Sequence, residues 1–240
     1  MQCDIEPIKH GLTNRSWLVS ADGDRFVVRI SDVESAEELQ IDRNSEAVVL
    51  DLVARAAVGP QVLCCDPVRG ILVTRYLGAT WTEQDAHAHD NIERLAGVLR
   101  RLHALDVPAG VRAVDLASTV RGYIRTLDER GGHSTLTSAE QRERAGETAA
   151  KLREGSTPRL CHNDVHHLNI VGGASVRLID WEYAGVGEPL FDLASVCVYH
   201  RYSKAERERL LSTYGAGSPQ RLELACWLFD YIRELWLAVR

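Results

Sequence analysis

The chain contains 240 residues, 45% of them hydrophobic and 26% charged, which is enough for a sizeable core in one bilobal unit or two small domains. Its formal net charge of −6 comes from 28 basic and 34 acidic side chains. A protein that wraps nucleic acid needs a surplus of Lys and Arg to neutralise phosphates, so this charge argues against a nucleic-acid partner.

The sequence shows no pattern typical of a membrane or secreted protein. The first ten residues are polar and acidic where a signal peptide would be apolar. No segment approaches the roughly 20 consecutive apolar residues that cross a bilayer. The six cysteines have neither metal-ligand spacing nor the density of a disulfide-rich secreted scaffold. We therefore expect a cytoplasmic protein with no membrane partner.

The first part of the chain predicts strands and one helix. Four segments are rich in β-formers and bounded by turn residues: 16–20, 25–30, 61–64 and 71–75. The first two flank a four-residue, Gly-containing turn at 21–24, which indicates a β-hairpin. A helix is expected from a cap at Asn44 or Ser45 through about Val58, where a Gly-Pro pair ends it.

From Gly78 onward the pattern becomes helical. Six segments repeat apolar residues at helical spacing: 83–105, 114–130, 138–153, 189–200, 204–212 and 221–239. Three short β-segments interrupt them, at 159–161, 169–171 and 176–179. The order of these elements predicts an α+β protein with two lobes, residues 1–77 and 78–240, joined by a hinge near 76–80.

The segment 161–169, CHNDVHHLN, carries the clearest chemical signal. Asn169 follows Asp164 by five residues, and Asp180 ends the next β-segment. Phosphoryl transfer needs a carboxylate that orients the attacking hydroxyl and accepts its proton, and oxygen ligands that hold Mg²⁺ against the phosphates. Asp164, Asn169 and Asp180 supply both kinds of group from two adjacent segments.

The spacing from His162 through Asp164 to Asn169, with Asp180 on the next hairpin, is that of a kinase catalytic loop. Together with IDWEY at 179–183, it resembles the aminoglycoside phosphotransferase and choline kinase superfamily. Residues 178–194 are especially similar to its choline/ethanolamine-kinase-like and thiamine-kinase-like branches. The segment GLTNRS at 11–16 resembles the nucleotide-covering loop of the choline kinase branch.

This resemblance implies a protein-kinase-like bilobal fold, with a small antiparallel β-lobe containing one helix and a mainly helical C-terminal lobe. It implies Asp164 as catalytic base, Asn169 and Asp180 as Mg²⁺ ligands, and ATP in the cleft near the hinge. Residues placed in the ATP site are Thr13, Asn14, Ser16, Arg29, Glu46, Thr74, Tyr76 and Leu77. Arg29 stands where protein kinases have a phosphate-contacting Lys, and Glu46 is its candidate partner on the helix. His162 and Asp192 are expected to brace the catalytic loop.

The acceptor expected from the resemblance is a small cationic alcohol of the choline, ethanolamine or thiamine type. Aromatic faces bind such cations, and the candidate contacts are Glu182, Tyr199 and Trp236. Packing of amphipathic helices is the competing interpretation of each aromatic residue. Arg233 stands where the choline kinase branch often has a second aromatic residue, which weakens a choline assignment.

Three alternatives stay open at this point. An aminoglycoside or sugar phosphotransferase would keep the same ATP residues. A catalytically silent nucleotide-binding protein is a second alternative, although such proteins commonly lose one of the three polar residues that are present here. A metal-dependent hydrolase using His162, His166 and His167 is a third, but no carboxylate or Cys accompanies them at zinc-site spacing.

Overall fold

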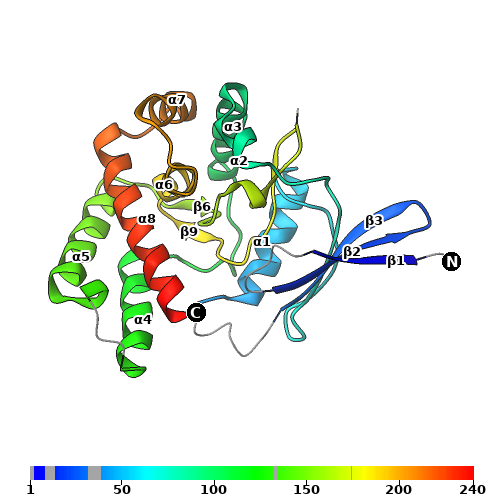
Figure 1. The fold of residues 1–240 in the computed structure, drawn as a ribbon, viewed down its shortest axis with the longest axis horizontal. Coiled ribbons are helices and arrows are strands. Elements are labelled where there is room, and N and C mark those ends of the chain that lie inside the picture. Colours follow the sequence, from blue (N-terminus) through cyan, green and yellow to red (C-terminus); the bar gives the residue numbers. More distant parts are fainter. Residues whose placement is uncertain (1–2, 9–13, 32–38, 132–134, 174) are drawn as a thin grey trace.

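A computed structural model describes residues 3–8, 14–31, 39–131, 135–173 and 175–240. Its N-terminal part is a five-stranded antiparallel sheet in the order β1-β2-β3-β5-β4. The strands are β1 Cys3–Ile8, β2 Asn14–Ala21, β3 Asp24–Ser31, β4 Val62–Asp66 and β5 Ile71–Arg75. The helix α1, Arg43–Arg55, contacts β4 and lies at the junction between this sheet and the helical part of the chain (Figure 1).

The hairpin expected near the N-terminus is present, but its turn is shorter than predicted. β2 and β3 pair through Ala21 and Asp24, so only Asp22 and Gly23 form the loop. Both have positive φ, +50° and +89°, as in the two-residue turns that match strand twist. The edge strand β1 was not predicted.

The cap of α1 differs from the prediction. Asp42, not Asn44 or Ser45, is the N-cap, and its side chain accepts hydrogen bonds from the backbone N–H groups of both. A carboxylate in this position satisfies donors that the first helical turn leaves free. The helix ends at Arg55 rather than near Val58.

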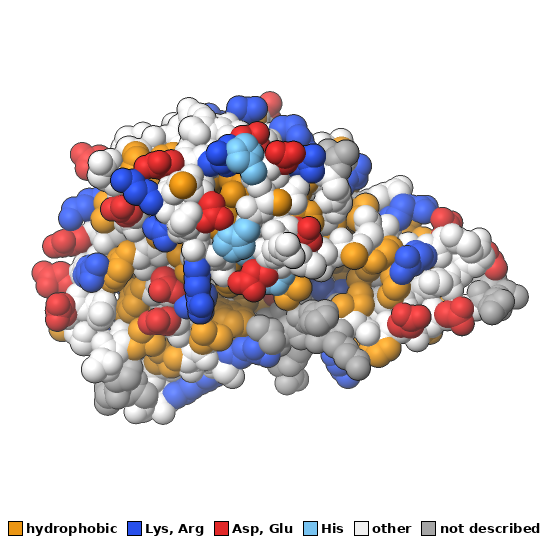
Figure 2. All heavy atoms as spheres, turned by 45° about the horizontal axis from the view of Figure 1, so that its top comes forward, with side chains coloured by type: hydrophobic (Ala, Val, Ile, Leu, Met, Phe, Trp, Pro, Cys, Tyr) orange, Lys and Arg blue, Asp and Glu red, His pale blue; other side chains and the backbone are white. Residues whose placement is uncertain are grey.

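The C-terminal part is mainly helical. Its helices are α2 Glu83–His87, α3 His89–His103, α4 Leu116–Glu129, α5 Ala139–Arg153, α6 Pro189–Tyr199, α7 Lys204–Tyr214 and α8 Pro219–Val239. The expected helix over 83–105 is two helices, because Ala88 adopts an extended conformation between α2 and α3. None of the described helices is long and apolar enough to span a membrane. On the face in Figure 2, Lys and Arg side chains are interspersed with Asp and Glu.

Two short β-ribbons lie within the helical part and flank the segment 161–169. β6 Arg159–Cys161 pairs with β9 Gly185–Gly187, and β7 Ile170–Val171 pairs with β8 Arg177–Leu178. β9 was not predicted from the sequence. A short 3₁₀ turn, His167–Asn169, leads into β7. The two-lobed α+β architecture is therefore as expected, and we propose residues 77 and 78 as the boundary because β5 ends at Arg75 and α2 begins at Glu83.

Candidate active site

The carboxylate of Asp164 lies in the loop between β6 and β7 and is held at both oxygens. The Tyr199 hydroxyl donates a hydrogen bond of 2.7 Å to Oδ1. The Asn169 side-chain amide donates to Oδ2 at 3.2 Å and to the Asp164 backbone oxygen at 2.9 Å. Burial raises the pKa of Asp164, but the nearby His166 and the Tyr199 hydroxyl outweigh it and hold the pKa below its ordinary value. Asp164 is thus ionised and oriented.

Asp192 on α6 contacts the backbone of the loop 161–169. Its Oδ2 accepts from the backbone N–H of His162 at 2.9 Å, and its Oδ1 accepts from that of Asn163 at 2.6 Å. The side chain is completely buried, with His103 Nε2 3.0 Å from Oδ2. A buried carboxylate that receives backbone donors in this way stabilises one loop conformation.

The His162 ring connects the loop 161–169 to the segment between β8 and β9, which carries Asp180. Its Nε2 lies 2.9 Å from the backbone oxygen of Ile179, and its ring centroid lies 4.6 Å from that of the buried Trp181. Asp192 thus contacts the loop from α6, and His162 contacts the neighbouring segment from within the loop. His166 lies close to Asp164, with Nε2 3.6 Å from Oδ2. No group of metal-ligating side chains in the described part of the chain includes these loop histidines, so the hydrolase alternative gains no support.

Asn169 and Asp180 fit the ligand chemistry of Mg²⁺. The Asn169 amide nitrogen is engaged by Asp164, which leaves its side-chain oxygen for a cation. The backbone N–H of Ile179 donates to the backbone carbonyl oxygen of Asn169 at 3.0 Å, so the two segments are adjacent. Burial and the nearby Glu182 carboxylate raise the pKa of Asp180 to about 7 despite Arg29. The Asp180 side chain is still 36% exposed, so a hard cation can reach this crowded oxygen site.

Arg29 and Glu46 form the ion pair expected between β3 and α1. Both terminal guanidinium nitrogens of Arg29 donate to the Glu46 carboxylate, at 2.7 and 2.8 Å, and both side chains are buried. Arg29 also lies 3.3 Å from Asp180 Oδ1. Burial raises the pKa of Glu46, but the Arg29 charge outweighs it and lowers the pKa overall. The Nε of Arg29 is buried and has no hydrogen-bond partner among the described residues.

Arg43 is a site residue that sequence reasoning missed. One of its terminal nitrogens donates to Glu46 at 2.8 Å and to Glu182 at 3.0 Å, and the other terminal nitrogen donates to Asn14 at 3.1 Å. The Asn14 amide in turn donates to Glu182 at 2.7 Å. Glu182 is buried in this network. The available signal was a basic residue three positions before Glu46 on the same helical face.

The other described residues predicted for the ATP site lie on the sheet or directly after β5. Ser16 pairs with Arg29 in the sheet, Thr74 is buried on β5, and the Arg25 guanidinium lies 4.2 Å from the centroid of the Tyr76 ring. Thr13 lies outside the described residues.

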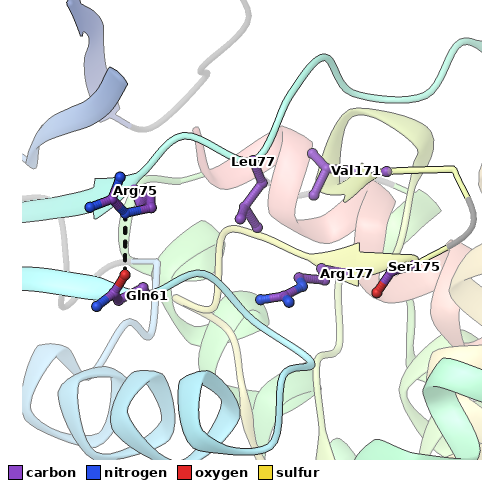
Figure 3. Close-up of a pocket in the computed structure, with 7 residues that line it drawn as sticks. Gln61, Arg75, Leu77, Val171, Ser175 and Arg177 are labelled. Carbon is purple, nitrogen blue, oxygen red and sulfur yellow. Dashed lines mark hydrogen bonds between the residues drawn. The ribbon is translucent and has the colours of Figure 1, made fainter. Parts of the chain in front are cut away.

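Leu77 points into a cavity of about 380 Å³ next to Arg75 at the end of β5 (Figure 3). The cavity is also lined by Gln61, Arg75, Val171, Gly172, Ser175 and Arg177. None of the three predicted catalytic and metal-binding residues is among the residues that line it.

Two aromatic side chains meet beside Glu182. The Trp236 indole N–H donates to the Tyr183 hydroxyl at 2.8 Å, which links α8 to the residue after Glu182. Tyr183 was not predicted as a site residue, although it lies in the quoted segment 179–183. By contrast, Trp227 and Tyr231 stack on each other at 5.6 Å, as expected of helix packing.

Comparison with known proteins places this geometry in a family. A family model described as "Phosphotransferase enzyme family" matches residues 4–225. The chain belongs to this family. The predicted enzyme class, a phosphotransferase, is thereby confirmed.

Individual relatives of this phosphotransferase support the same conclusion. Protein LicA of Haemophilus influenzae is 26% identical over 208 residues, covering 85% of this chain and 60% of LicA's own length. Thiamine kinase of Shigella boydii is 33% identical over 240 residues, covering 98% of this chain and 76% of the relative. The crystal structure of choline kinase LicA from Streptococcus pneumoniae superposes with a TM-score of 0.83 at 21% identity, covering 98% and 84% of the two chains. The predicted kinase-like fold is thereby confirmed.

Proposed function

We propose that this phosphotransferase transfers the γ-phosphoryl group of ATP to a hydroxyl of a small cationic alcohol of the choline, ethanolamine or thiamine type. The observation that carries the proposal is the arrangement of three side chains. Asp164 is bound at Oδ2 by Asn169, and Asn169 is joined through its backbone to the residue before Asp180. One carboxylate for the acceptor proton therefore stands beside two oxygen ligands for a cation.

Each of these residues has a distinct role in the proposal. Asp164 orients the acceptor hydroxyl and accepts its proton, as an ionised carboxylate can. Asn169 and Asp180 hold Mg²⁺, which when bound neutralises the charge of the phosphates. Arg29 contacts phosphate, and Glu46 keeps its guanidinium in place.

The nucleotide in this proposal is ATP, bound between the sheet and the catalytic loop. A structure of LicA in complex with AMP superposes with a TM-score of 0.80 at 20% identity, so the same fold accommodates an adenine nucleotide. Ser16, Thr74, Tyr76 and Leu77 remain candidate contacts. For Asn14 we propose an indirect role, because its side chain is bonded to Arg43 and Glu182.

The acceptor class is inferred from the chemistry near Asp164. Tyr183 and Trp236 supply aromatic side chains, and aromatic faces attract organic cations. Glu182 adds negative charge at the hairpin, although its carboxylate is bound by Arg43. The relatives named thiamine kinase and choline kinase have acceptors of this kind. An antibiotic acceptor is the second candidate, because a spectinomycin phosphotransferase shares the fold, with a lower TM-score of 0.64.

The test is acceptor-dependent ADP release from MgATP across choline, ethanolamine, thiamine, several sugars and aminoglycosides. The Asp164→Ala variant is compared with wild type, and Asp90→Ala, an exposed carboxylate on α3, is the matched control. We expect one acceptor class to stimulate ADP release, with a loss of at least about 10²-fold in Asp164→Ala and none in the control. Equal rates in wild type and Asp164→Ala would exclude Asp164 as the base. Binding of MgATP without any acceptor-dependent rate would favour a catalytically silent nucleotide-binding protein.

A further inference from the structure

One face of α6 contacts the catalytic loop at successive positions. Asp192, Ser195 and Tyr199 are spaced i, i+3 and i+7, so their side chains lie on the same side of the helix. Asp192 accepts from two backbone N–H groups that precede Asp164. The Ser195 hydroxyl accepts from the backbone N–H of Val165, directly after Asp164, at 3.1 Å. The helix therefore holds the loop backbone on both sides of the catalytic carboxylate.

Tyr199 is the residue of this face that contacts the carboxylate itself. Its hydroxyl donates to Asp164 Oδ1 at 2.7 Å, the length of a strong bond to an ionised acceptor. The ring is fixed by two neighbours, with centroids 4.9 Å from His166 and 5.3 Å from Phe229. A donor on a packed ring needs little reordering before it binds, so this contact is preorganised.

The second oxygen of Asp164 is held from a different segment. Oδ2 accepts from the Asn169 amide at 3.2 Å. Rotation of the carboxylate about its Cβ–Cγ bond would therefore break a hydrogen bond to α6 and another within the loop. Each carboxylate oxygen has two lone pairs, so the carboxylate can accept both bonds and still face an incoming hydroxyl.

We propose that Tyr199 is a positioning residue that fixes the rotation of the Asp164 carboxylate for proton transfer. This inference rests on the proposed function, in which Asp164 is the base. In that reaction the acceptor O–H bond breaks and its proton passes to Asp164. The acceptor oxygen then forms a bond to the γ-phosphorus, and the bond from this phosphorus to the bridging oxygen of ADP breaks with its electron pair. Tyr199 acts through Asp164, whereas the sequence suggested that it contacts the substrate.

The test is Tyr199→Phe, which removes the hydroxyl and keeps the ring. We expect kcat to fall about 10- to 30-fold while KM for ATP and for the acceptor changes less than about threefold, because an oriented base matters in the transition state. Tyr231→Phe is the matched control. It removes a hydroxyl that donates to the Leu136 oxygen at 2.8 Å, away from Asp164, and should leave kcat unchanged.

A rescue experiment separates positioning from packing. Replacement of Tyr199 by 4-aminophenylalanine restores a donor at the same place and should return kcat to within about threefold of wild type. Failure of this rescue would overturn the proposal. So would a Tyr199→Phe variant that keeps its kcat, or one whose acceptor KM alone rises, since the latter is the behaviour of a substrate contact.

Failure of the Tyr199 proposal can be told apart from failure of the proposed function. If no tested acceptor is phosphorylated, wild type and Tyr199→Phe can still be compared by their slow hydrolysis of MgATP, in which water is the acceptor. A fall of about tenfold in Tyr199→Phe would support the proposal, and equal hydrolysis would overturn it. A wild-type protein that neither phosphorylates any acceptor nor hydrolyses MgATP would exclude Asp164 as a catalytic base. It would therefore also exclude a positioning role for Tyr199.

Discussion

The guanidinium of Arg43 lies 3.0 Å from the carboxylate of Glu182, although the two residues are 139 positions apart in the chain. Arg43 belongs to α1 beside the sheet, and Glu182 lies two positions after the predicted metal ligand Asp180, between β8 and β9 of the helical lobe. Both side chains are buried. This ion pair therefore joins the two lobes next to the residues proposed for catalysis.

Loss of Arg43 should destabilise the protein. Arg43→Ala removes the guanidinium that binds two buried carboxylates, Glu46 and Glu182. We expect the free energy of unfolding to fall by about 3 kcal/mol, because removing one partner of a buried ion pair is strongly destabilising. Urea denaturation at pH 7 measures this change. The matched control is Arg55→Ala on the same helix, whose exposed pair with Asp51 should contribute less than about 1 kcal/mol. Equal losses in the two variants would contradict this account.

Removal of the Asp180 carboxylate should impair use of the metal. Asp180→Asn keeps the shape of the side chain but removes a charged oxygen ligand, so we expect ADP release at saturating acceptor to fall by at least about 10²-fold. A titration of Mg²⁺ at fixed ATP, with Asp66→Asn on β4 as control, measures the effect. A wild-type response to Mg²⁺ in Asp180→Asn would place the metal elsewhere.

Acid should weaken the fold through His200. This side chain is 1% exposed, and burial lowers its pKa to about 4. The unfolded chain, with an ordinary pKa of about 6.5, binds more protons between these values, so the free energy of unfolding falls as pH drops through that window. The free energy of unfolding should fall by about 3 kcal/mol once the pH is below both pKa values, and this contribution is fully present above pH 7.

Denaturation at pH 7, 6 and 5 checks this expectation. The slope of stability against pH should decrease in His200→Gln, which carries no titrating ring. His89→Gln, an exposed histidine at the start of α3, should keep the wild-type slope. Parallel slopes for wild type and His200→Gln would show that His200 is not the group responsible.

Two adjacent glycines between β7 and β8, Gly172 and Gly173, should respond differently to replacement by alanine. Gly172 has φ of +91°, and a Cβ atom there would clash with the Ser175 carbonyl oxygen. Gly172→Ala should lower the free energy of unfolding by about 1–3 kcal/mol, because a side chain strains this conformation. A Cβ at Gly173 meets no atom within 4 Å, so Gly173→Ala should stay within about 0.5 kcal/mol of wild type. Similar melting temperatures for both variants would refute the clash.

The predictions from the sequence were most accurate where the information is local. Spacing along the chain pointed to Asp164, Asn169 and Asp180, and the structure places the segments that carry them next to one another. Their catalytic and metal-binding roles stay predictions. The helices of the C-terminal lobe were predicted from apolar periodicity. A helix that packs on a core must place an apolar residue on the same face every three or four positions. The errors were also local. Asp42 displaced Asn44 and Ser45 as the cap, and Ala88 divided one expected helix into two.

The sequence by itself determined the two-lobed fold class, the phosphotransferase family and the residues proposed for catalysis and metal binding. Only the tertiary structure brought Arg43 to Glu182, Trp236 to Tyr183, and the Tyr199 hydroxyl to the Asp164 carboxylate. The physical reason is distance along the chain. Spacing and periodicity constrain neighbours within a few turns of backbone, whereas the partner of a buried charge or hydroxyl depends on how whole elements pack.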